Sequence, residues 1–344
     1  MFRFECDYCE GAHPLILQAL AKTNLEQTPG YGLDPYCARA AARIRQICEA
    51  PKADVHFLVG GTQANTTVIA AALRPWQGAV AVSEGHIAVH ETGAIEAAGH
   101  KVLTLPPHNG KMDAQDLRAL CKAHFDDSSR EHTVQPGIVY ISHPTETGTL
   151  YTLHELEALR AVCDTYGLPL FLDGARLAYG LAAEGTDLTL GNLARLCDVF
   201  YIGGTKAGAL FGEAVVITND SLKKDFRYNI KQRGGMLAKG RLLGIQFDTL
   251  LRNSLYLQIG QHADRLALQI RRTCLEKGLP MAVDSPTNQQ FFVFPDTALA
   301  KLEQNFTFSP ICKPDASHTE VRICTSWAST DTAVNALCSA ISAL

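Results

Sequence analysis

The sequence predicts an α/β protein with a three-layer α/β/α large domain around a mostly parallel seven-stranded sheet, and a smaller α+β C-terminal domain. Short apolar segments alternate with helical segments between residues 54 and 218, which is typical of strand–helix–strand units. Several of the apolar segments are almost continuously hydrophobic, as expected when helices cover both faces of a sheet. After residue 218 the alternation gives way to longer helical stretches.

The alternating region contains the predicted sheet. Its seven strands are predicted at residues 54–59, 78–83, 100–106, 136–142, 168–173, 198–203 and 213–218. Helices with apolar residues at helical spacing are predicted at residues 62–73, 114–125 and 152–167. The last of them opens with Thr152 followed by Glu155, the pattern of a capping box. Each predicted helix therefore connects two strands.

Three regions are predicted along the chain. Residues 1–30 form an N-terminal arm with one helical segment at residues 13–24. Residues 31–250 form the large domain. Residues 251–344 form the small domain, with helical sequence to about residue 274, strands near residues 289–295 and 320–328, and a last helix that runs to the end of the chain.

Composition and charge narrow the class of partner. The chain has 344 residues, of which 47% are hydrophobic, and a formal net charge of −4 without a Lys/Arg block. This charge pattern argues against nucleic acid or a membrane surface as partner and favours a small polar substrate. The first residues lack the pattern of a secretion signal, and no apolar run reaches the roughly 20 residues of a membrane span, so a cytoplasmic protein is expected.

Eleven cysteines are scattered along the chain and are expected to be reduced and mostly buried. Cys6, Cys9 and His13 have a spacing that a zinc ion could use, but no second pair of ligands follows at a suitable distance. No metal site is therefore expected there.

Polar residues at the carboxyl ends of the strands carry the functional signal, because ligands of open α/β sheets bind at this edge. Gly60, Gly61 and Thr62 follow the first strand and precede a helix, so their backbone could hold a phosphate at the helix N-terminus, although a plain turn has the same sequence. His86 and His90 follow the second strand. Their spacing permits a shared metal ion, but no third ligand is evident; a ring that lies flat on a cofactor and an ordinary surface or core histidine both remain open.

One further strand ends in an acidic residue, and the strand after it is followed by a basic residue. Asp173 ends an apolar strand, where a buried carboxylate needs a cation, either Arg176 or a ligand. Lys206 follows the next strand, and a desolvated lysine can lose its proton and attack an aldehyde. An amine, a carboxylate that could keep a pyridine nitrogen protonated and a phosphate cradle together indicate pyridoxal 5′-phosphate as cofactor.

These residues lie in motifs that resemble the low-specificity threonine aldolases, which belong to the β-eliminating lyase group with the aspartate aminotransferase type of fold (fold type I). The matching segments cover most of the chain and occur in the order CDYCEGAHP, TPGYGLDP, GGTQAN, GHIAVHETGAIEAAG, PTETGTLYT, LDGARL, GGTKAG, RGGMLAKG and VRICTSWASTDTAV. The resemblance implies a pyridoxal-phosphate enzyme.

The resemblance also implies roles for individual residues. Lys206 would form the Schiff base with the cofactor, Asp173 would pair with the pyridine nitrogen, and His86 would stack on the ring. The cofactor-binding set would comprise Gly60, Gly61, Thr62, His86, Asp173, Arg176 and Lys206.

A second implied set would contact the substrate. Arg176 and Arg322 would bind its carboxylate, and the set also includes Cys6, Tyr31 and His90. Tyr31 lies in a loop that would reach into the site of a partner subunit, since the family resembles obligate dimers that often pair into tetramers. A homodimer or homotetramer with active sites at the dimer interface is therefore expected.

Three positions depart from the family's pattern. Cys6 stands where many relatives have serine, and Glu146 stands where they have histidine. Leu237 follows Met236 where relatives often carry a phosphate-binding arginine, which leaves Arg233 or Lys239 as candidate replacements.

The function that follows is cleavage of β-hydroxy-α-amino acids of the threonine or allo-threonine type to glycine and an aldehyde. The base for the β-hydroxyl stays open among His86, His90, Glu146 and a water molecule. One alternative keeps the cofactor but eliminates at the β-carbon, which releases pyruvate and ammonia from serine- or cysteine-like substrates. The other is a non-catalytic binding protein with the same fold.

Overall fold

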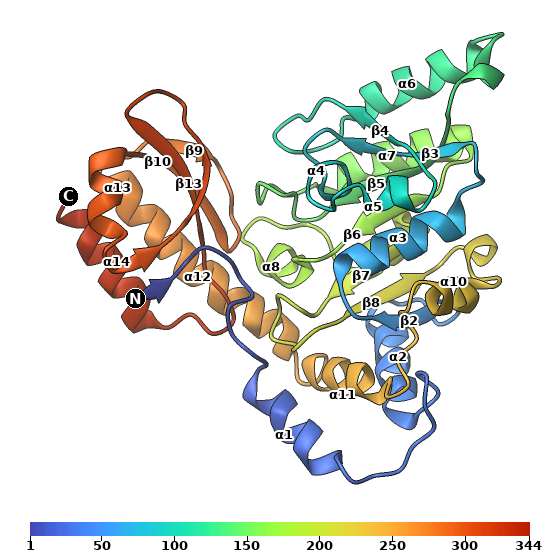
Figure 1. Ribbon diagram of the computed structural model, residues 1–344, viewed down its shortest axis with the longest axis horizontal. Coiled ribbons are helices and arrows are strands. Elements are labelled where there is room, and N and C mark those ends of the chain that lie inside the picture. Colours follow the sequence, from blue (N-terminus) through green and yellow to red (C-terminus); the bar gives the residue numbers. More distant parts are fainter.

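The computed structural model describes residues 1–344 and contains the predicted seven-stranded sheet (Figure 1). Its strands lie in the order β2-β8-β7-β6-β5-β3-β4. Their bounds are β2 Asp54–Leu58, β3 Gln77–Val82, β4 Val102–Leu105, β5 Gln135–Ser142, β6 Leu170–Asp173, β7 Val199–Gly203 and β8 Glu213–Ile217. β8 runs antiparallel to both of its neighbours, and all other neighbouring pairs are parallel. The predicted fold class is therefore confirmed.

Helices cover both faces of this sheet because successive strand residues point to opposite sides. Ile138 and Tyr140 of β5 belong to one apolar core, whereas Val139 and Ile141 belong to the other. The first core is covered by α3 (Gly61–Ala72), α4 (His86–Val89), α5 (Ala94–Ala97) and α10 (Phe226–Gln232). The second is covered by α2 (Pro35–Ile47), α6 (Ala114–Asp126), α7 (Leu153–Tyr166), α8 (Leu177–Ala182), α9 (Leu190–Leu196) and α11 (Arg241–Leu250).

Local sequence signals fix several helix ends. The predicted capping box is present at α7, where the Thr152 and Glu155 side chains each bond the other's backbone. α7 ends at Gly167, which has the left-handed φ of 66° that favours glycine. Asp34 caps α2 by accepting from two backbone N–H groups, although the sequence analysis did not predict this helix.

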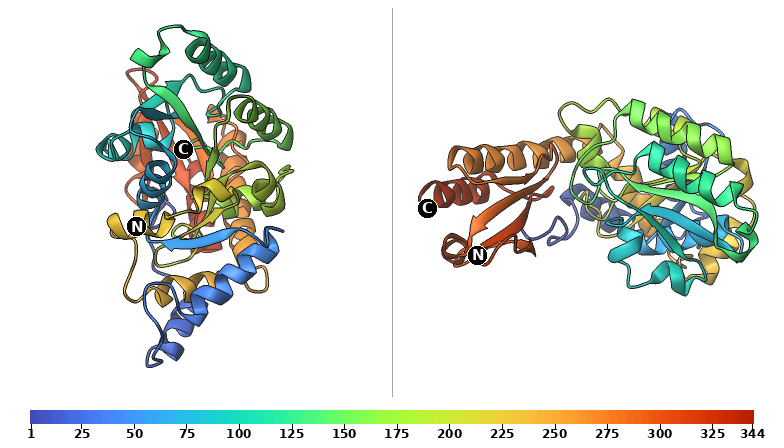
Figure 2. Two further views of the ribbon diagram at one scale, coloured as in Figure 1. Left: turned by 90° about the vertical axis from the view of Figure 1, so that its right-hand side faces the viewer. Right: turned by 90° about the horizontal axis from the view of Figure 1, so that it is seen from above.

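A second sheet forms the core of the C-terminal part. Its order is β12-β13-β10-β9, and all neighbouring strands are antiparallel. The bounds are β9 Met281–Val283, β10 Gln289–Pro295, β12 Ser309–Cys312 and β13 His318–Cys324. It packs on α12 (Leu255–Glu276), α13 (Asp296–Leu302) and α14 (Asp331–Ser342), and this unit lies beside the large sheet (Figure 2).

The N-terminal segment joins the two parts of the molecule. β1 (Phe2–Arg3) pairs in parallel with β11 (Phe306–Thr307) of the C-terminal unit, as the blue strand in Figure 1 shows. The chain then crosses to α1 (Pro14–Thr23), which packs against α11. The segment between β1 and α1 therefore lies between the two sheets. The predicted boundaries at residues 30 and 250 stay predictions.

α12 links the two apolar cores. Tyr256 and Ile259 in its first half pack into the core of the large sheet, and Leu266 and Ile270 in its second half pack into the C-terminal core. None of the helices combines the length and the apolar character that crossing a membrane requires.

Candidate active site

A cavity of about 320 Å³ opens at the carboxyl edge of the large sheet. β2, β5, β6 and β7 all end at this edge, and the antiparallel β8 begins there, because Gly203 at the end of β7 lies opposite Glu213. The cavity is lined by residues from each of these ends, among them Gly60, Gly61, Thr62, His86, Ser142, Glu146, Asp173, Arg176, Lys206 and Glu213. Parallel connectivity thus gathers residues that are far apart in the sequence.

Asp173 is buried at the end of β6 and is held by neutral donors. Its Oδ2 accepts from the Tyr140 hydroxyl at 2.6 Å and from Asn65 Nδ2 at 3.1 Å. Its Oδ1 accepts from the Tyr201 hydroxyl and from the Ala175 backbone N–H at 3.0 Å. Each donor stabilises the charged form of a carboxylate. Neither tyrosine nor Asn65 was predicted from the sequence, although alternation along β5 and β7 puts both rings on the face that Asp173 shares.

Arg176 does not pair with Asp173, so that alternative from the sequence is wrong. Its Nε and Nη2 donate to the two oxygens of Asp7 at 2.7 and 3.0 Å, and Asn288 Nδ2 also donates to Asp7 at 3.0 Å. Burial alone would raise the pKa of Asp7, but Arg176 and Lys206 lower it below its ordinary value. The partner was not predictable, because Asp7 arrives from the N-terminal segment.

Lys206 is half-buried in the turn after β7. The Tyr179 hydroxyl donates to its backbone oxygen at 2.6 Å, and its Nζ lies 5.9 Å from the centre of the Tyr8 ring. Burial and the neighbouring Arg176 charge lower the pKa of the amine. A Cβ on Gly203 would lie 2.5 Å from the Ala175 oxygen, so only glycine permits this close approach of the turn.

Glu213 is an acid beside Lys206 that the sequence analysis missed. It accepts from the Gly204 N–H at 3.1 Å and from the Thr205 hydroxyl at 2.8 Å. Burial raises the pKa of Glu213 to about 8. Burial thus acts toward the uncharged form of both groups, because it raises the pKa of Glu213 and lowers that of Lys206.

His86 begins α4 and is oriented by a buried acid. Its Nδ1 lies 2.7 Å from Glu91 Oε1, and Asn65 Nδ2 donates to the same oxygen at 2.7 Å. Since Asn65 also donates to Asp173, one amide connects the two carboxylates. The network holds the imidazole with Nδ1 toward Glu91 and leaves Nε2 available. The sequence analysis did not predict Glu91.

Glu146 lies beside His86 in the same cavity. Its Oε1 accepts from the His86 backbone N–H at 2.8 Å and from the Ser142 hydroxyl at 2.7 Å, whereas Oε2 forms no hydrogen bond within the chain. Burial raises the pKa of this carboxyl. Glu146 therefore holds a proton at a higher pH than an exposed glutamate does, and its free Oε2 is available for proton transfer.

The Gly60–Thr62 turn leaves the first turn of α3 free for a ligand. Gly60 is the N-cap and no side chain caps the helix. Gly60, Gly61 and Thr62 all line the cavity, and even a Cβ added at Gly60 would meet nothing within 4 Å. A 12-residue helix that begins with uncapped N–H groups favours an anion at this point.

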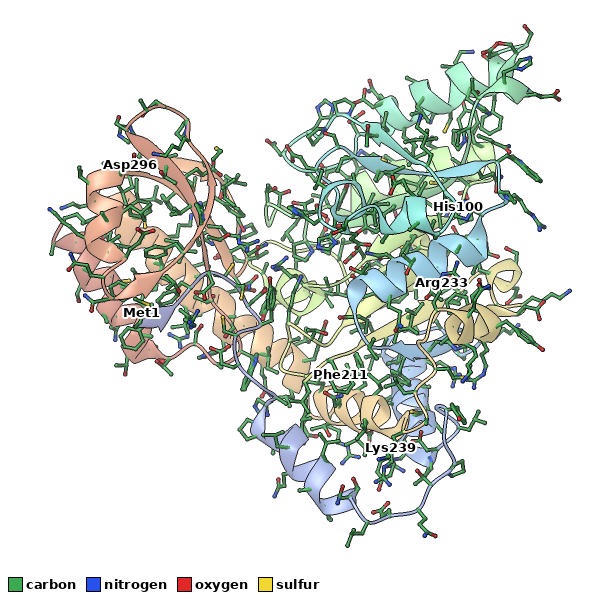
Figure 3. All side chains as sticks on the ribbon, in the orientation of Figure 1. Met1, His100, Phe211, Arg233, Lys239 and Asp296 are labelled. Atoms are coloured by element: carbon green, nitrogen blue, oxygen red, sulfur yellow. The ribbon has the colours of Figure 1, made fainter.

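Other residues predicted for the site do not line this cavity within the chain. His90 is exposed, and its ring centre is 5.6 Å from that of His86. Tyr31 lines a different cavity, where the Lys231 amine lies 5.0 Å from its ring centre. Neither candidate for the missing arginine lines the cavity either: Figure 3 places Arg233 beside α10 and Lys239 just before α11.

Cys6 belongs to the N-terminal segment, and Arg322 on β13 contacts this segment. Arg322 Nη2 donates to the Glu5 backbone oxygen at 3.1 Å and Nη1 to Gln289 Oε1 at 3.4 Å, whereas its buried Nε has no partner. The Cys6 sulfur lies 3.3 Å from that of Cys9. His13, the third residue of the possible zinc motif, caps α1 by accepting from the Leu15 N–H at 3.3 Å.

Comparisons with known proteins agree with this geometry. Residues 7–294 match the model of the family described as "Beta-eliminating lyase". The chain is 32% identical over 267 residues to a low specificity L-threonine aldolase of Pseudomonas aeruginosa, covering 77% of this chain and 76% of that protein. It is 44% identical to the solved threonine aldolase of Leishmania major, with a TM-score of 0.96 and coverage of 99% and 98%. An aspartate aminotransferase of Thermus thermophilus, 16% identical with a TM-score of 0.73 over 100% of this chain and 91% of its own, shares the fold.

Proposed function

This chain belongs to the family of β-eliminating lyases, and we propose that it is a pyridoxal-phosphate enzyme that cleaves β-hydroxy-α-amino acids of the threonine type to glycine and an aldehyde. The observation that carries the proposal is that Lys206, Asp173 and the uncapped N-terminus of α3 face one cavity. Few ligands need an amine, a carboxylate and an anion cradle together.

The residues of the cavity fit the cofactor. The free N–H groups at Gly60–Thr62 suit its phosphate, the Asp173 carboxylate suits its ring nitrogen, and the Lys206 amine suits its aldehyde. Bound there, the cofactor supplies an aldehyde that an amine can attack and a ring that accepts the electron pair left on the substrate's α-carbon. The Arg176 charge and burial keep Lys206 ready to react, because both lower its pKa.

The substrate carboxylate is assigned to the arginines near the cavity. Arg322 has a buried Nε without a partner, which a carboxylate oxygen would satisfy. Arg176 is held by Asp7 through Nε and Nη2, so Nη1 and the second N–H of Nη2 are left for the substrate. Asp7 acts here as a positioning residue that fixes the plane of the guanidinium.

We assign the removal of the β-hydroxyl proton to Glu146. His90 is exposed and outside the cavity, and His86 is held by Glu91 in an orientation that suits a ring lying over the cofactor. Glu146 lines the cavity, its Oε2 has no hydrogen bond within the chain, and Ser142 and the His86 backbone hold Oε1. A positioned carboxylate of raised pKa is a suitable base.

Glu146→Gln tests this assignment through pH. A base must be deprotonated to act, so kcat/KM of the wild type should fall as the pH drops through the raised pKa of Glu146. In the variant this acidic limb should disappear, and the rate at neutral pH should drop by about 10²-fold. The matched control is Glu84→Gln, which changes an exposed glutamate outside the cavity and should leave the profile unchanged. An unaltered acidic limb and rate in Glu146→Gln would contradict the assignment.

A product assay tests the function. Purified protein with pyridoxal phosphate is expected to release equimolar glycine and acetaldehyde from L-threonine or L-allo-threonine. Pyruvate and ammonia from serine or cysteine, with no aldehyde from threonine, would favour β-elimination instead. A protein that binds added pyridoxal phosphate but turns over none of these substrates would indicate the binding protein.

The chain is also proposed to work as a homodimer or homotetramer. Large apolar side chains are exposed on the loop before α2, where Leu25 is 92% and Leu33 is 68% exposed. Tyr31 lies on the same loop, away from the cavity of its own chain. A second copy that covers this loop would bury the apolar groups and bring Tyr31 to the partner's site.

A further inference from the structure

The two thiols of the CDYC segment lie in direct contact. Cys6 and Cys9 have their sulfur atoms 3.3 Å apart, and both are free thiols. Cys9 is exposed and Cys6 is partly exposed, so small molecules in solution can reach the pair. A disulfide needs the sulfurs at about 2.05 Å, so closing the bond requires an approach of just over 1 Å.

A movement of the two sulfur atoms would displace neighbouring residues of the active site. The two residues between the thiols are Asp7, which holds Arg176 through two hydrogen bonds, and Tyr8, which lines the cavity beside Lys206. The segment is anchored on both sides: the Cys324 N–H donates to the Phe4 oxygen at 2.8 Å, and Glu10 accepts from Ser326 at 3.3 Å. A shift of the sulfurs therefore has to be absorbed by Asp7 and Tyr8.

We propose that Cys6 and Cys9 form a thiol–disulfide modification site at the rim of the cavity, whose oxidant is a small disulfide of the glutathione type. The Cys6 thiolate attacks one sulfur of the oxidant, which forms a mixed disulfide and releases one reduced thiol. The Cys9 thiol then loses its proton and attacks the Cys6 sulfur, which releases the second reduced thiol. Two protein thiols are oxidised, and one external disulfide is reduced to two thiols.

The groups around Cys9 also affect the rate of this thiol–disulfide exchange. Burial and the hydrogen bond with Cys6 raise the pKa of Cys9 to about 12, and Glu5 and Glu10 add to the rise. Cys9 therefore carries little thiolate near neutral pH, so the first attack on the oxidant is assigned to Cys6. Ring closure is expected to be the slower step and to become faster as the pH rises, because it needs the Cys9 thiolate.

Peptide mass spectrometry tests the proposal without relying on activity. Trypsin releases residues 4–22 as one peptide that contains both cysteines. After incubation of the full protein with glutathione disulfide and quenching of free thiols, this peptide should be about 2 Da lighter than its fully reduced form. Cys9→Ala should retain at most a mixed disulfide at Cys6. A wild-type peptide that stays reduced, or that stops at the mixed disulfide, would overturn the proposal.

A measurement of activity then tests whether the Cys6–Cys9 disulfide alters the active site. This second measurement rests on the proposed function. Wild-type kcat/KM should fall by up to ~10²-fold in proportion to the bridged fraction, because displacements near 1 Å at a catalytic centre cost that much. Dithiothreitol should restore it. Cys312→Ser, which changes an exposed cysteine on β12, should behave as the wild type. Bridged protein with unchanged kinetics would refute the coupling, whereas an unoxidised protein without any turnover would contradict only the proposed function.

Discussion

Replacing Lys206 with alanine is expected to abolish both turnover and covalent attachment of pyridoxal phosphate. The lysine amine is the group that bonds to the cofactor aldehyde, and no other lysine lines the cavity. Turnover of threonine should fall by about 10³-fold or more, as for other removed nucleophiles. The fold should survive, because the hydrogen bond that Lys206 accepts from Tyr179 uses its backbone oxygen.

Borohydride reduction gives the second measurement on this variant. In the wild type it should fix the cofactor to Lys206, so that trypsin no longer cleaves there and releases residues 196–223 as one labelled peptide. No labelled peptide is expected from Lys206→Ala. Lys239→Ala is the control, since that lysine lies outside the cavity. Undiminished labelling in Lys206→Ala would remove the central residue of the proposed site.

Asp173→Asn is expected to lower kcat by about 10²–10³-fold while the protein stays folded. The change keeps the shape of the side chain but removes the charge that would keep the cofactor's ring nitrogen protonated. It also places an amide group opposite donors that now face the carboxylate, namely the Asn65 amide and the Ala175 N–H. We therefore expect a loss of about 1–3 kcal/mol in the free energy of unfolding.

Asp264→Asn is the matched control for this variant. Asp264 and Asp173 are equally buried, each with 4% of its surface exposed, but Asp264 does not line the cavity. Burial raises the pKa of Asp264 well above its ordinary value, so a neutral amide replaces a group whose uncharged form burial favours. Its kcat should stay at the wild-type level. Wild-type kcat in Asp173→Asn would contradict the role of the carboxylate, whatever the control does.

The ion-pair partner of Arg176 could not be inferred from the sequence. Its position three residues after Asp173 suggested a local ion pair, yet its partner is Asp7. Three further acids of the site, Glu91, Glu146 and Glu213, contact His86 or the turn before Lys206. Of these, only Glu146 was identified from the sequence, as a departure from a family motif and as a candidate base.

The seven-stranded α/β core and the positions of Asp173, His86 and Lys206 after its strands were predictable from the amino-acid sequence. These features follow from local periodicity and from parallel connections, which bring the carboxyl ends of distant strands to one edge. The three-dimensional structure was needed to see which charges pair, in which acids burial raises the pKa, and that Cys6 contacts Cys9. Those properties depend on distances and burial between segments that no spacing encodes, because the N-terminal segment crosses between two sheets before its side chains meet the site.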